Sequence, residues 1–344
     1  MDIKKTISNN LFWVGLWLAQ FFLFFFLQRS SRWIDFIQSL FYKTQYFRVR
    51  LLKGIPFSVG DVFYLLLVVY IVTSLLLMIR NKTRKKIFRN LLIVLNALYF
   101  VYQIQWGTLY FQLPLLDKSQ IYAPVKNSDL KILAEKYLEK SKESRANFKD
   151  SVFKVRDLRP IIKAIESQQK NRNFTISVKP SLWGGLMSYS GILGYYNPFS
   201  SEAQVNQNLP HTYLIFTMAH EASHQIGFAR EEEANFSAFI IGQKSENPEL
   251  RYASNWFALK NILYNLSAQD EGYVRDFINK LPQPLKNDYL VEKDFYNRYS
   301  GKVASFFSFT NDLFLKSNQQ DGSVSYNYFI YLLLEYEKSS GLTQ

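Results

Sequence analysis

Residues 211–227 read HTYLIFTMAHEASHQIG and contain the motif HEASH at positions 220–224. The apolar residues before the motif continue a helical pattern, and Gly227 suits the end of that helix. On a helix, residues four apart are separated by one turn and about 40°, so His220 and His224 present their imidazoles on one face. Two imidazoles so placed can fill two corners of a zinc tetrahedron. We therefore expect a helix that carries a metal site.

Glu221 follows the first histidine directly and would lie beside the metal. A carboxylate in that place can accept a proton from a zinc-bound water. A structural zinc site closes with four protein ligands, whereas a catalytic site has three and leaves the fourth position to water. The chain has no cysteine to complete a structural site. The motif therefore predicts a zinc-dependent hydrolase, most directly a peptidase, with Glu221 as its general base.

An acidic run follows the motif and offers the third ligand. It consists of Glu231, Glu232 and Glu233, and the apolar stretch 236–241 behind it predicts a second helix. Glu231 and Asn235 are four residues apart, so Asn235 could orient Glu231 or bond the first helix. We expect Glu231 to be the third zinc ligand, with Glu232 as the alternative that the spacing leaves open. A simpler interpretation is that the glutamates only favour a helix N-terminus through its dipole.

Other polar residues of the chain could also belong to this site. His211 lies half a helical turn out of phase with His220, so it should face away from the metal and serve the structure. Zinc hydrolases often add a Tyr, His or Arg that stabilises the oxyanion. Tyr252, Tyr326 and Arg230 are candidates for that role, although each of the 23 tyrosines is more often a packing residue.

Three long apolar runs occupy the first 111 residues, and each approaches the roughly 20 residues that cross a bilayer. Transmembrane helices are expected at about residues 9–28, 60–80 and 90–111. Trp13, Tyr99 and Trp106 suit the aromatic belts at a membrane interface. The alternative is that these runs form buried core helices of a soluble protein.

The charges divide the chain in the same place. Residues 1–111 hold 14 Lys and Arg against 3 Asp and Glu, whereas residues 112–344 hold 27 against 25. The net charge of +13 therefore belongs mainly to the apolar part. This distribution removes the main argument for a nucleic-acid partner, and none is expected. Basic loops beside spans indicate instead a lipid bilayer as partner.

The basic residues also predict the topology. Six Lys and Arg and no acid lie within positions 80–89, and Lys4 and Lys5 lie near the N-terminus. The positive-inside rule makes both segments cytoplasmic. Three crossings then place residues 112–344 on the outer, periplasmic face of a bacterial inner membrane. The loop 28–58 is basic as well, and its apolar residues at helical spacing predict an amphipathic helix on the membrane surface.

The remaining residues predict a connector at 112–127 and one mostly helical α+β domain at 128–344. Residues 174–178 alternate between apolar and polar and predict a strand. In zinc peptidases generally, a strand beside the metal helix pairs with the substrate backbone. Residues 191–199 are the candidate for that strand, and a loop and hairpin without substrate contact is the alternative.

Two segments of the sequence are similar to a known family. They are YYNPFSSEAQVN at 195–206 and HEASHQIGFAREEEANF at 220–236, joined by RYAS at 251–254 and GSVSY at 322–326. Together with the three N-terminal spans they resemble a bacterial family of unassigned function, domain of unknown function 3810, whose members are predicted to be membrane-anchored zinc peptidases. The resemblance covers essentially the whole chain.

What the resemblance implies agrees with the pattern. It implies a zincin-like fold, His220 and His224 as ligands, Glu221 as base and an acidic residue at 231 or 232 as third ligand. The spacing of Glu231 and Asn235 also resembles the second motif of glutamate-type zinc peptidases.

The sequence thus predicts three N-terminal transmembrane helices followed by a zincin-like domain that binds Zn²⁺ and hydrolyses a peptide or protein substrate of the cell envelope. Two other interpretations stay open. One is a non-catalytic membrane protein with a structural or sensory metal site, and the other is a membrane scaffold in which the motif is accidental.

Overall fold

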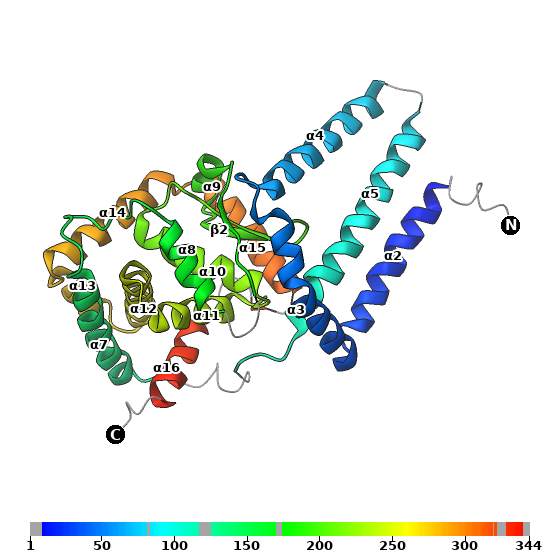
Figure 1. Cartoon of the computed structure of the whole chain (residues 1–344). Helices are drawn as coiled ribbons and strands as arrows, with labels where there is room; N and C mark the ends of the chain where they lie inside the picture. The colour runs from blue at the N-terminus through cyan, green and yellow to red at the C-terminus, as the bar shows by residue number, and fades with distance from the viewer. Residues whose placement is uncertain are drawn as a thin grey trace.

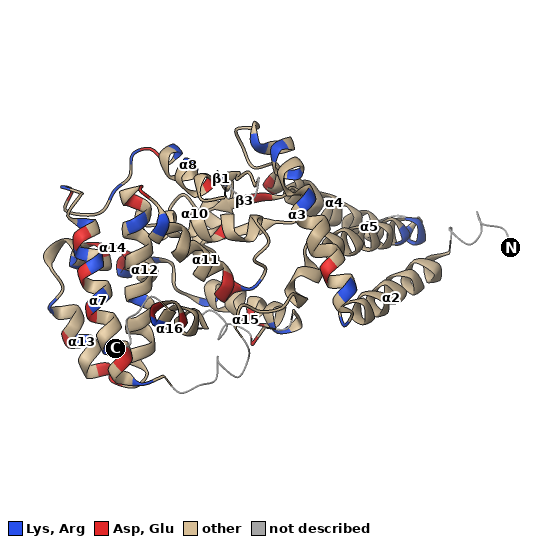
Figure 2. Ribbon diagram, turned by 60° about the horizontal axis from the view of Figure 1, so that its bottom comes forward, with Lys and Arg blue, Asp and Glu red and all other residues tan. Residues whose placement is uncertain are grey.

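The computed structural model describes residues 9–80, 83–116, 125–169, 174–318, 320–321 and 328–339. Figure 1 shows long helices that project from a mostly helical body containing a small sheet. Charged residues gather on the body and at the ends of the projecting helices, which are otherwise free of charge over most of their length (Figure 2).

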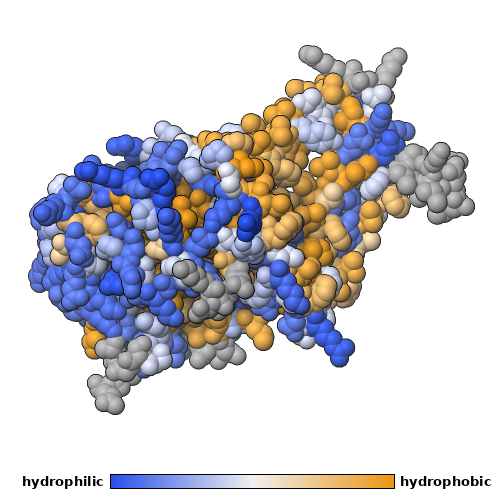
Figure 3. All heavy atoms as spheres, viewed as in Figure 1, coloured by the Kyte–Doolittle hydropathy of each residue, from blue (hydrophilic) through white to orange (hydrophobic). Residues whose placement is uncertain are grey.

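The projecting helices are α2 (Asn10–Leu27), α4 (Val59–Arg80) and α5 (Arg84–Gln105), and each is long and apolar enough to cross a membrane. Only 6%, 6% and 17% of their apolar windows is buried inside the protein. Figure 3 shows hydrophobic residues gathered over the part of the molecule that these helices form. A soluble protein rarely exposes this much apolar surface to water. The prediction of three apolar N-terminal helices is confirmed, and they indicate association with a membrane.

Amide side chains join α2 to α5. Gln20 donates to the Oδ1 of Asn96 at 2.9 Å, and Gln28 donates to the Oε1 of Gln103 at 2.8 Å. Asn96 is 3% exposed. Polar pairs of this kind hold helices together where no water competes for the hydrogen bonds.

The third apolar helix lies earlier in the chain than predicted. The sequence indicated 90–111, whereas α5 ends at Gln105 and a 3₁₀ helix, η1 (Gly107–Phe111), follows. The backbone leaves the helical region at Trp106, and the Thr108 hydroxyl donates to the Gln103 carbonyl at 2.8 Å, which satisfies a carbonyl left open at the helix end. The segment after the helix therefore turns toward the body.

The basic loop after α2 forms the helix α3 (Ser31–Lys53), as its apolar periodicity predicted. One side of α3 is buried against the body through Ile37, Phe41, Gln45 and Val49, which follow one another at four-residue spacing. Gln45 donates to the Thr175 carbonyl at 2.7 Å and accepts from its amide at 3.3 Å. The helix therefore docks on the body and does not lie only on a membrane surface.

The body is built from ten further helices within the described residues. They are α7 (Asn127–Arg145), α8 (Arg159–Ser167), α9 (Gly184–Ser190), α10 (His211–Gln225), α11 (Glu231–Lys244), α12 (Pro248–Ser267), α13 (Glu271–Asn279), α14 (Gln283–Tyr299), α15 (Lys302–Ser317) and α16 (Phe329–Ser339). The sheet contains β1 (Val178–Pro180), β2 (Gly194–Asn197) and β3 (Glu202–Val205) in the order β1-β3-β2. β3 is parallel to β1 and antiparallel to β2.

Helix α10 lies at the centre of the body and contacts α11, α12, β2 and β3. Its apolar side chains are almost fully buried and lie around most of the helix, as in a helix that protein surrounds. They are Leu214, Ile215, Met218, Ala219 and Ala222. The most central helix of the body therefore carries the HEASH motif.

The strand predicted at 174–178 is displaced to Val178–Pro180. Several backbone groups before Val178 form hydrogen bonds with side chains instead of with another strand. The Thr175 backbone bonds the side chain of Gln45, and the Ser177 amide donates to the side-chain oxygen of Gln225 at 2.8 Å. Side chains from α3 and α10 thus take the place of a neighbouring strand.

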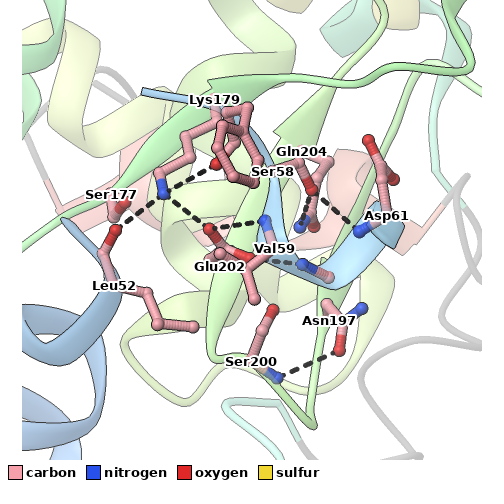
Figure 4. Close-up of polar contacts among 12 residues, drawn as sticks. Leu52, Ser58, Val59, Asp61, Ser177, Lys179, Asn197, Ser200, Glu202 and Gln204 are labelled. Carbon is pink, nitrogen blue, oxygen red and sulfur yellow. Dashed lines mark hydrogen bonds and ion pairs between the residues drawn. The ribbon is translucent and has the colours of Figure 1, made fainter. Parts of the chain in front are cut away.

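A buried ion pair in the sheet holds α3 and α4 to the rest of the body (Figure 4). The Lys179 ammonium lies 2.6 Å from Glu202 and donates to the Leu52 carbonyl at 2.7 Å. Glu202 in turn accepts from the Gly60 amide at 2.7 Å, in the first turn of α4. A carboxylate at this position interacts favourably with the dipole of α4. One ion pair thereby fixes both the end of α3 and the start of α4.

We predict that Glu202→Ala lowers the free energy of unfolding by about 3–5 kcal/mol, because it leaves the Lys179 ammonium buried without its counter-charge. Denaturant unfolding of the full chain in detergent measures the change. The double variant Lys179→Met with Glu202→Leu should recover much of the loss, since it removes both charges. Equal stability of Glu202→Ala and wild type would contradict this role of the pair.

Candidate metal centre

Helix α10 brings the two motif histidines together. The Nε2 atoms of His220 and His224 lie 3.1 Å apart, and the ring planes meet at 89°. The spacing of four residues on one helix accounts for this approach. Both rings therefore present a nitrogen atom to the same small volume.

Glu231, the first residue of α11, completes the cluster. Its Oε2 lies 3.3 Å from the Nε2 of His220 and 3.7 Å from the Nε2 of His224. Zinc bonds nitrogen at about 2.0–2.1 Å and carboxylate oxygen at about 2.0–2.2 Å, so a tetrahedral ion separates its ligand atoms by roughly 3.3–3.5 Å. The three donor atoms lie 3.1–3.7 Å apart, a range that includes this separation, and two imidazoles with one carboxylate are donors that could hold a metal ion such as zinc.

The three consecutive glutamates have different surroundings. Glu231 is the one that reaches both histidines. Glu232 is buried, and burial raises the pKa of its carboxyl group to about 7; its Oε2 has no hydrogen-bond partner among the described residues. Glu233 accepts from the Leu115 amide at 2.8 Å. The geometry therefore favours Glu231 over Glu232 as a ligand.

Hydrogen bonds at the Nδ1 atoms, on the side of each ring away from the cluster, fix the orientation of both rings. The Nδ1 of His220 lies 2.8 Å from the Oδ1 of Asn235, and the Nδ1 of His224 lies 2.6 Å from the carbonyl oxygen of Phe228. Each acceptor requires the proton on Nδ1, which leaves the Nε2 lone pair for a metal ion. Asn235 therefore bonds the first helix, through His220, which is one of the two roles that the sequence indicated for it.

The Phe228 carbonyl reaches His224 because the chain reverses at Gly227. Gly227 has a φ of +109° and follows the C-cap of α10, and the Phe228 amide donates to the Ser223 carbonyl at 3.1 Å. A left-handed residue that ends a helix in this manner is usually glycine. A Cβ atom at Gly227 would also lie 2.7 Å from the ring of Tyr42 on α3. Gly227 ends the helix as predicted, and the turn that it makes also brings the Phe228 carbonyl to His224.

Burial and the interaction between the carboxylate and the imidazoles set the charges of the cluster. Burial alone would raise the pKa of Glu231, but the two imidazoles hold it well below its usual range. Burial opposes protonation of His224, but the Glu231 carboxylate outweighs it and raises the His224 pKa to about 9. A metal ion competes with that proton, since only neutral imidazole is a ligand. An ionised carboxylate that is only 13% exposed and lies beside two nitrogen donors is a favourable electrostatic setting for a cation.

Glu221 lies on the same helix and beside the sheet. Its side chain is 4% exposed, and burial raises its pKa to about 7, although both imidazoles oppose the rise. A Cβ atom at Gly194 would lie 2.7 Å from the Oε1 of Glu221. Strand β2 therefore passes directly over the Glu221 carboxylate, and the sheet order makes β2 an edge strand. This strand lies inside the candidate segment 191–199.

The end of α5 forms one wall of the cluster, which the sequence did not indicate. The Trp106 ring lies 5.7 Å from the His224 ring, edge to face, and 4.6 Å from the Tyr196 ring on β2. Trp106 is 5% exposed, so it is a packing residue and not part of an interfacial belt. The candidate metal centre therefore lies at the end of the third apolar helix.

The remaining predicted residues have other partners. Arg230 donates to the backbone carbonyls of Tyr110 and Gln112 at 3.2 and 2.8 Å. Tyr252 is fully buried and its hydroxyl lies 2.7 Å from Asp288. Tyr326 lies outside the described residues. The structure thus brings neither the Arg230 nor the Tyr252 polar group into the cluster.

His211, at the start of α10, also stands apart from the cluster. Its Nδ1 accepts a hydrogen bond of 2.6 Å from the Val155 amide, and burial lowers its pKa. This contact ties the beginning of α10 to the segment before α8.

We predict that Glu231→Ala loses stoichiometric zinc, because it removes one of three ligand atoms, whereas Glu232→Gln keeps it. Asn235→Ala should weaken zinc binding by about 10- to 100-fold through loss of the bond to His220. Zinc content after dialysis against chelators of graded strength measures each variant. The ligand assignment fails if Glu232→Gln loses the metal and Glu231→Ala retains it.

We also predict that Gly194→Ala lowers the free energy of unfolding by about 1–3 kcal/mol, the usual cost of overpacking a core. The added Cβ would lie 2.8 Å from the Gln204 carbonyl oxygen, and this backbone atom has little freedom to move. Gly185→Ala is the matched control, since nothing lies within 4 Å of its added Cβ. Thermal unfolding measures both variants. An unfolding temperature of Gly194→Ala equal to that of Gly185→Ala would contradict the close approach at Gly194.

Comparison with known proteins places the chain in a family. No curated protein and no solved structure matches it. A family model described as "Protein of unknown function (DUF3810)" matches residues 36–334, which extend from α3 into α16 and include all three members of the cluster. The chain belongs to this DUF3810 family.

Proposed function

We propose that this protein is a membrane-anchored, zinc-dependent metallopeptidase. The observation that carries the proposal is the convergence of His220, His224 and Glu231, whose donor atoms lie 3.1–3.7 Å apart, beside the buried carboxylate of Glu221. The same residue types at this spacing hold zinc and a general base in HExxH hydrolases.

The role of Glu221 favours catalysis over a structural or sensory metal site. A structural zinc site needs four protein ligands and no further carboxylate, whereas the cluster found in the described residues has three. Glu221 follows a proposed ligand, but among the described residues it forms no ion pair or hydrogen bond that would give it a structural purpose. A pKa of about 7 suits a group that accepts and returns a proton near neutral pH.

In the proposed reaction, His220, His224 and Glu231 would hold zinc, which when bound would supply a Lewis acid for the scissile carbonyl and for the attacking water. Glu221 accepts the proton of the attacking water at its carboxylate and passes it to the nitrogen of the leaving amine. Asn235 and the Phe228 carbonyl hold the imidazoles in orientation throughout.

The edge strand β2 supplies a place for the substrate. A sheet edge binds an extended peptide through backbone hydrogen bonds. Because Gly194 at the start of β2 touches the Glu221 side chain, a peptide paired along this edge would pass close to the general base. This supports a peptide or protein as the substrate class.

The proposed location follows from the two ends of α5. Its first residues are basic, Arg84 to Lys86 with Arg89, and its other end contacts the cluster through Trp106. If the basic end is cytoplasmic, as the positive-inside rule requires, the cluster lies on the outer face of the inner membrane. The proposed substrates are therefore peptides or proteins of the cell envelope.

We predict that Glu221→Gln keeps its zinc and loses hydrolysis by a factor of about 10²–10⁴, the usual contribution of general acid–base catalysis. The full chain in detergent is loaded with zinc, its metal content is measured, and cleavage of a peptide library is followed by mass spectrometry. Glu135→Gln, an exposed position on α7 away from the cluster, is the matched control and should cleave like wild type.

Two results would count against the proposal. Cleavage by Glu221→Gln at the wild-type rate would remove the mechanism. Zinc-loaded wild type that cleaves no peptide in the library would favour the non-catalytic metal site.

A further inference from the structure

Helix α15 exposes its apolar residues instead of burying them. Val303, Phe306, Phe309 and Leu313 are between 49% and 62% exposed. Counted at 100° per residue, these four side chains share one side of the helix, here called the α15 face. Leu315 is the buried residue of α15. A helix on the surface of a soluble protein shows the opposite arrangement, with its apolar stripe toward the core.

The short helix α9 packs beside α15 and adds to its apolar surface. A Cβ atom at Gly191, the C-cap of α9, would lie 3.9 Å from the Cβ of Ala304. Leu182, Leu186 and Tyr189, in and just before α9, are between 56% and 59% exposed. Two neighbouring elements thus present large apolar side chains outward.

Helices α9 and α15 both contact the apolar helices at the ends that lie next to the body. The Leu182 amide donates to the Oδ2 of Asp61 at 2.7 Å, and Asp61 belongs to the first turn of α4. The Phe314 ring lies 6.1 Å from the ring of Tyr110, in η1 directly after α5. Figures 1 and 2 show α15 at the junction between the three apolar helices and the body. The α15 face therefore lies at the level where α4 and α5 meet the body.

We propose that α15, with the adjoining α9, rests on the lipid bilayer and inserts the α15 face at the boundary between head groups and acyl chains. The partner follows from the continuity with the apolar helices, because a bilayer that surrounds α4 and α5 ends at this level. Lys302 and Lys316 lie at the two ends of α15, where they can approach anionic head groups. A helix with phenylalanines on one face and lysines beside it is typical of membrane interfaces.

The proposal depends on the three apolar helices and not on the metal centre. It also gives α3 a counterpart, because α3 exposes Phe36, Phe47 and Leu51 at the same junction, and Figure 2 shows α3 and α15 on opposite sides of it. The body would then contact lipid through two helices, one on each side of the apolar helices.

The test uses the absence of cysteine in the chain, which makes any introduced thiol a unique labelling position. Phe306→Cys and Leu313→Cys place an environment-sensitive fluorophore on the α15 face. Ser308→Cys is the matched control, because it lies two residues from Phe306, is exposed, and points about 160° away on the same helix. Each full chain is reconstituted into vesicles of phosphatidylcholine and phosphatidylglycerol.

Quenching by lipids that carry a nitroxide on the acyl chain should be severalfold stronger at Phe306 and Leu313 than at Ser308. A water-soluble quencher should show the reverse order. Equal access of the soluble quencher to all three positions would overturn the proposal. Protection of the α15 face from both quenchers would overturn it as well, because a second protein chain would then cover the face. Unfolding temperatures like that of wild type confirm that the variants are folded.

Discussion

The contact of the Glu231 carboxylate with the imidazoles of His220 and His224 is the interaction on which the arrangement of the body depends. A carboxylate away from water costs several kcal/mol unless cationic or hydrogen-bonding groups surround it. Here both imidazoles face it, and each imidazole is held from behind by Asn235 or by the Phe228 carbonyl. The start of α11, the reversal of the chain after α10 and the registry of the two helices all serve to bring these groups together. The carboxylate and the imidazoles thus find charged or hydrogen-bonding partners beside an otherwise apolar core.

The second constraint is that the apolar helices are part of the site and not only an anchor. Trp106 at the end of α5 packs on His224, and Gln45 of α3 takes the hydrogen bonds of Thr175 beside the sheet. Glu202 binds the first turn of α4, and the Tyr195 hydroxyl on β2 bonds Asp61 of that turn. The strand that touches Glu221 is therefore held directly by a helix that is apolar enough to cross a membrane.

The features that the sequence predicted well are those encoded by short-range spacing. Four-residue spacing on α10 brings His220 and His224 together, and uninterrupted apolar runs produce α2, α4 and α5. Among the three glutamates, the one that lies beside both histidines is Glu231, which the sequence ranked first as the candidate ligand. What it could not indicate depends on contacts between distant segments. An interfacial tryptophan and one packed on an imidazole look alike in the sequence, as Trp106 shows. Likewise, residues 174–177 alternate like a strand but bond side chains from α3 and α10.

Contacts between distant segments also affect where the chain can be divided into domains. By composition the boundary lies near residue 111, between an apolar and a polar part. By packing, a boundary there would cut through one cluster of buried side chains, which is formed by Ile37, Phe41, Trp106, Leu109, Tyr110, Tyr196 and Ala229. A fragment without the first 111 residues would expose the His224 ring to water and deprive Lys179 of the Leu52 carbonyl. The helices that would hold the protein in a membrane thus also cover the His224 ring of the candidate metal centre, and neither part is complete without the other.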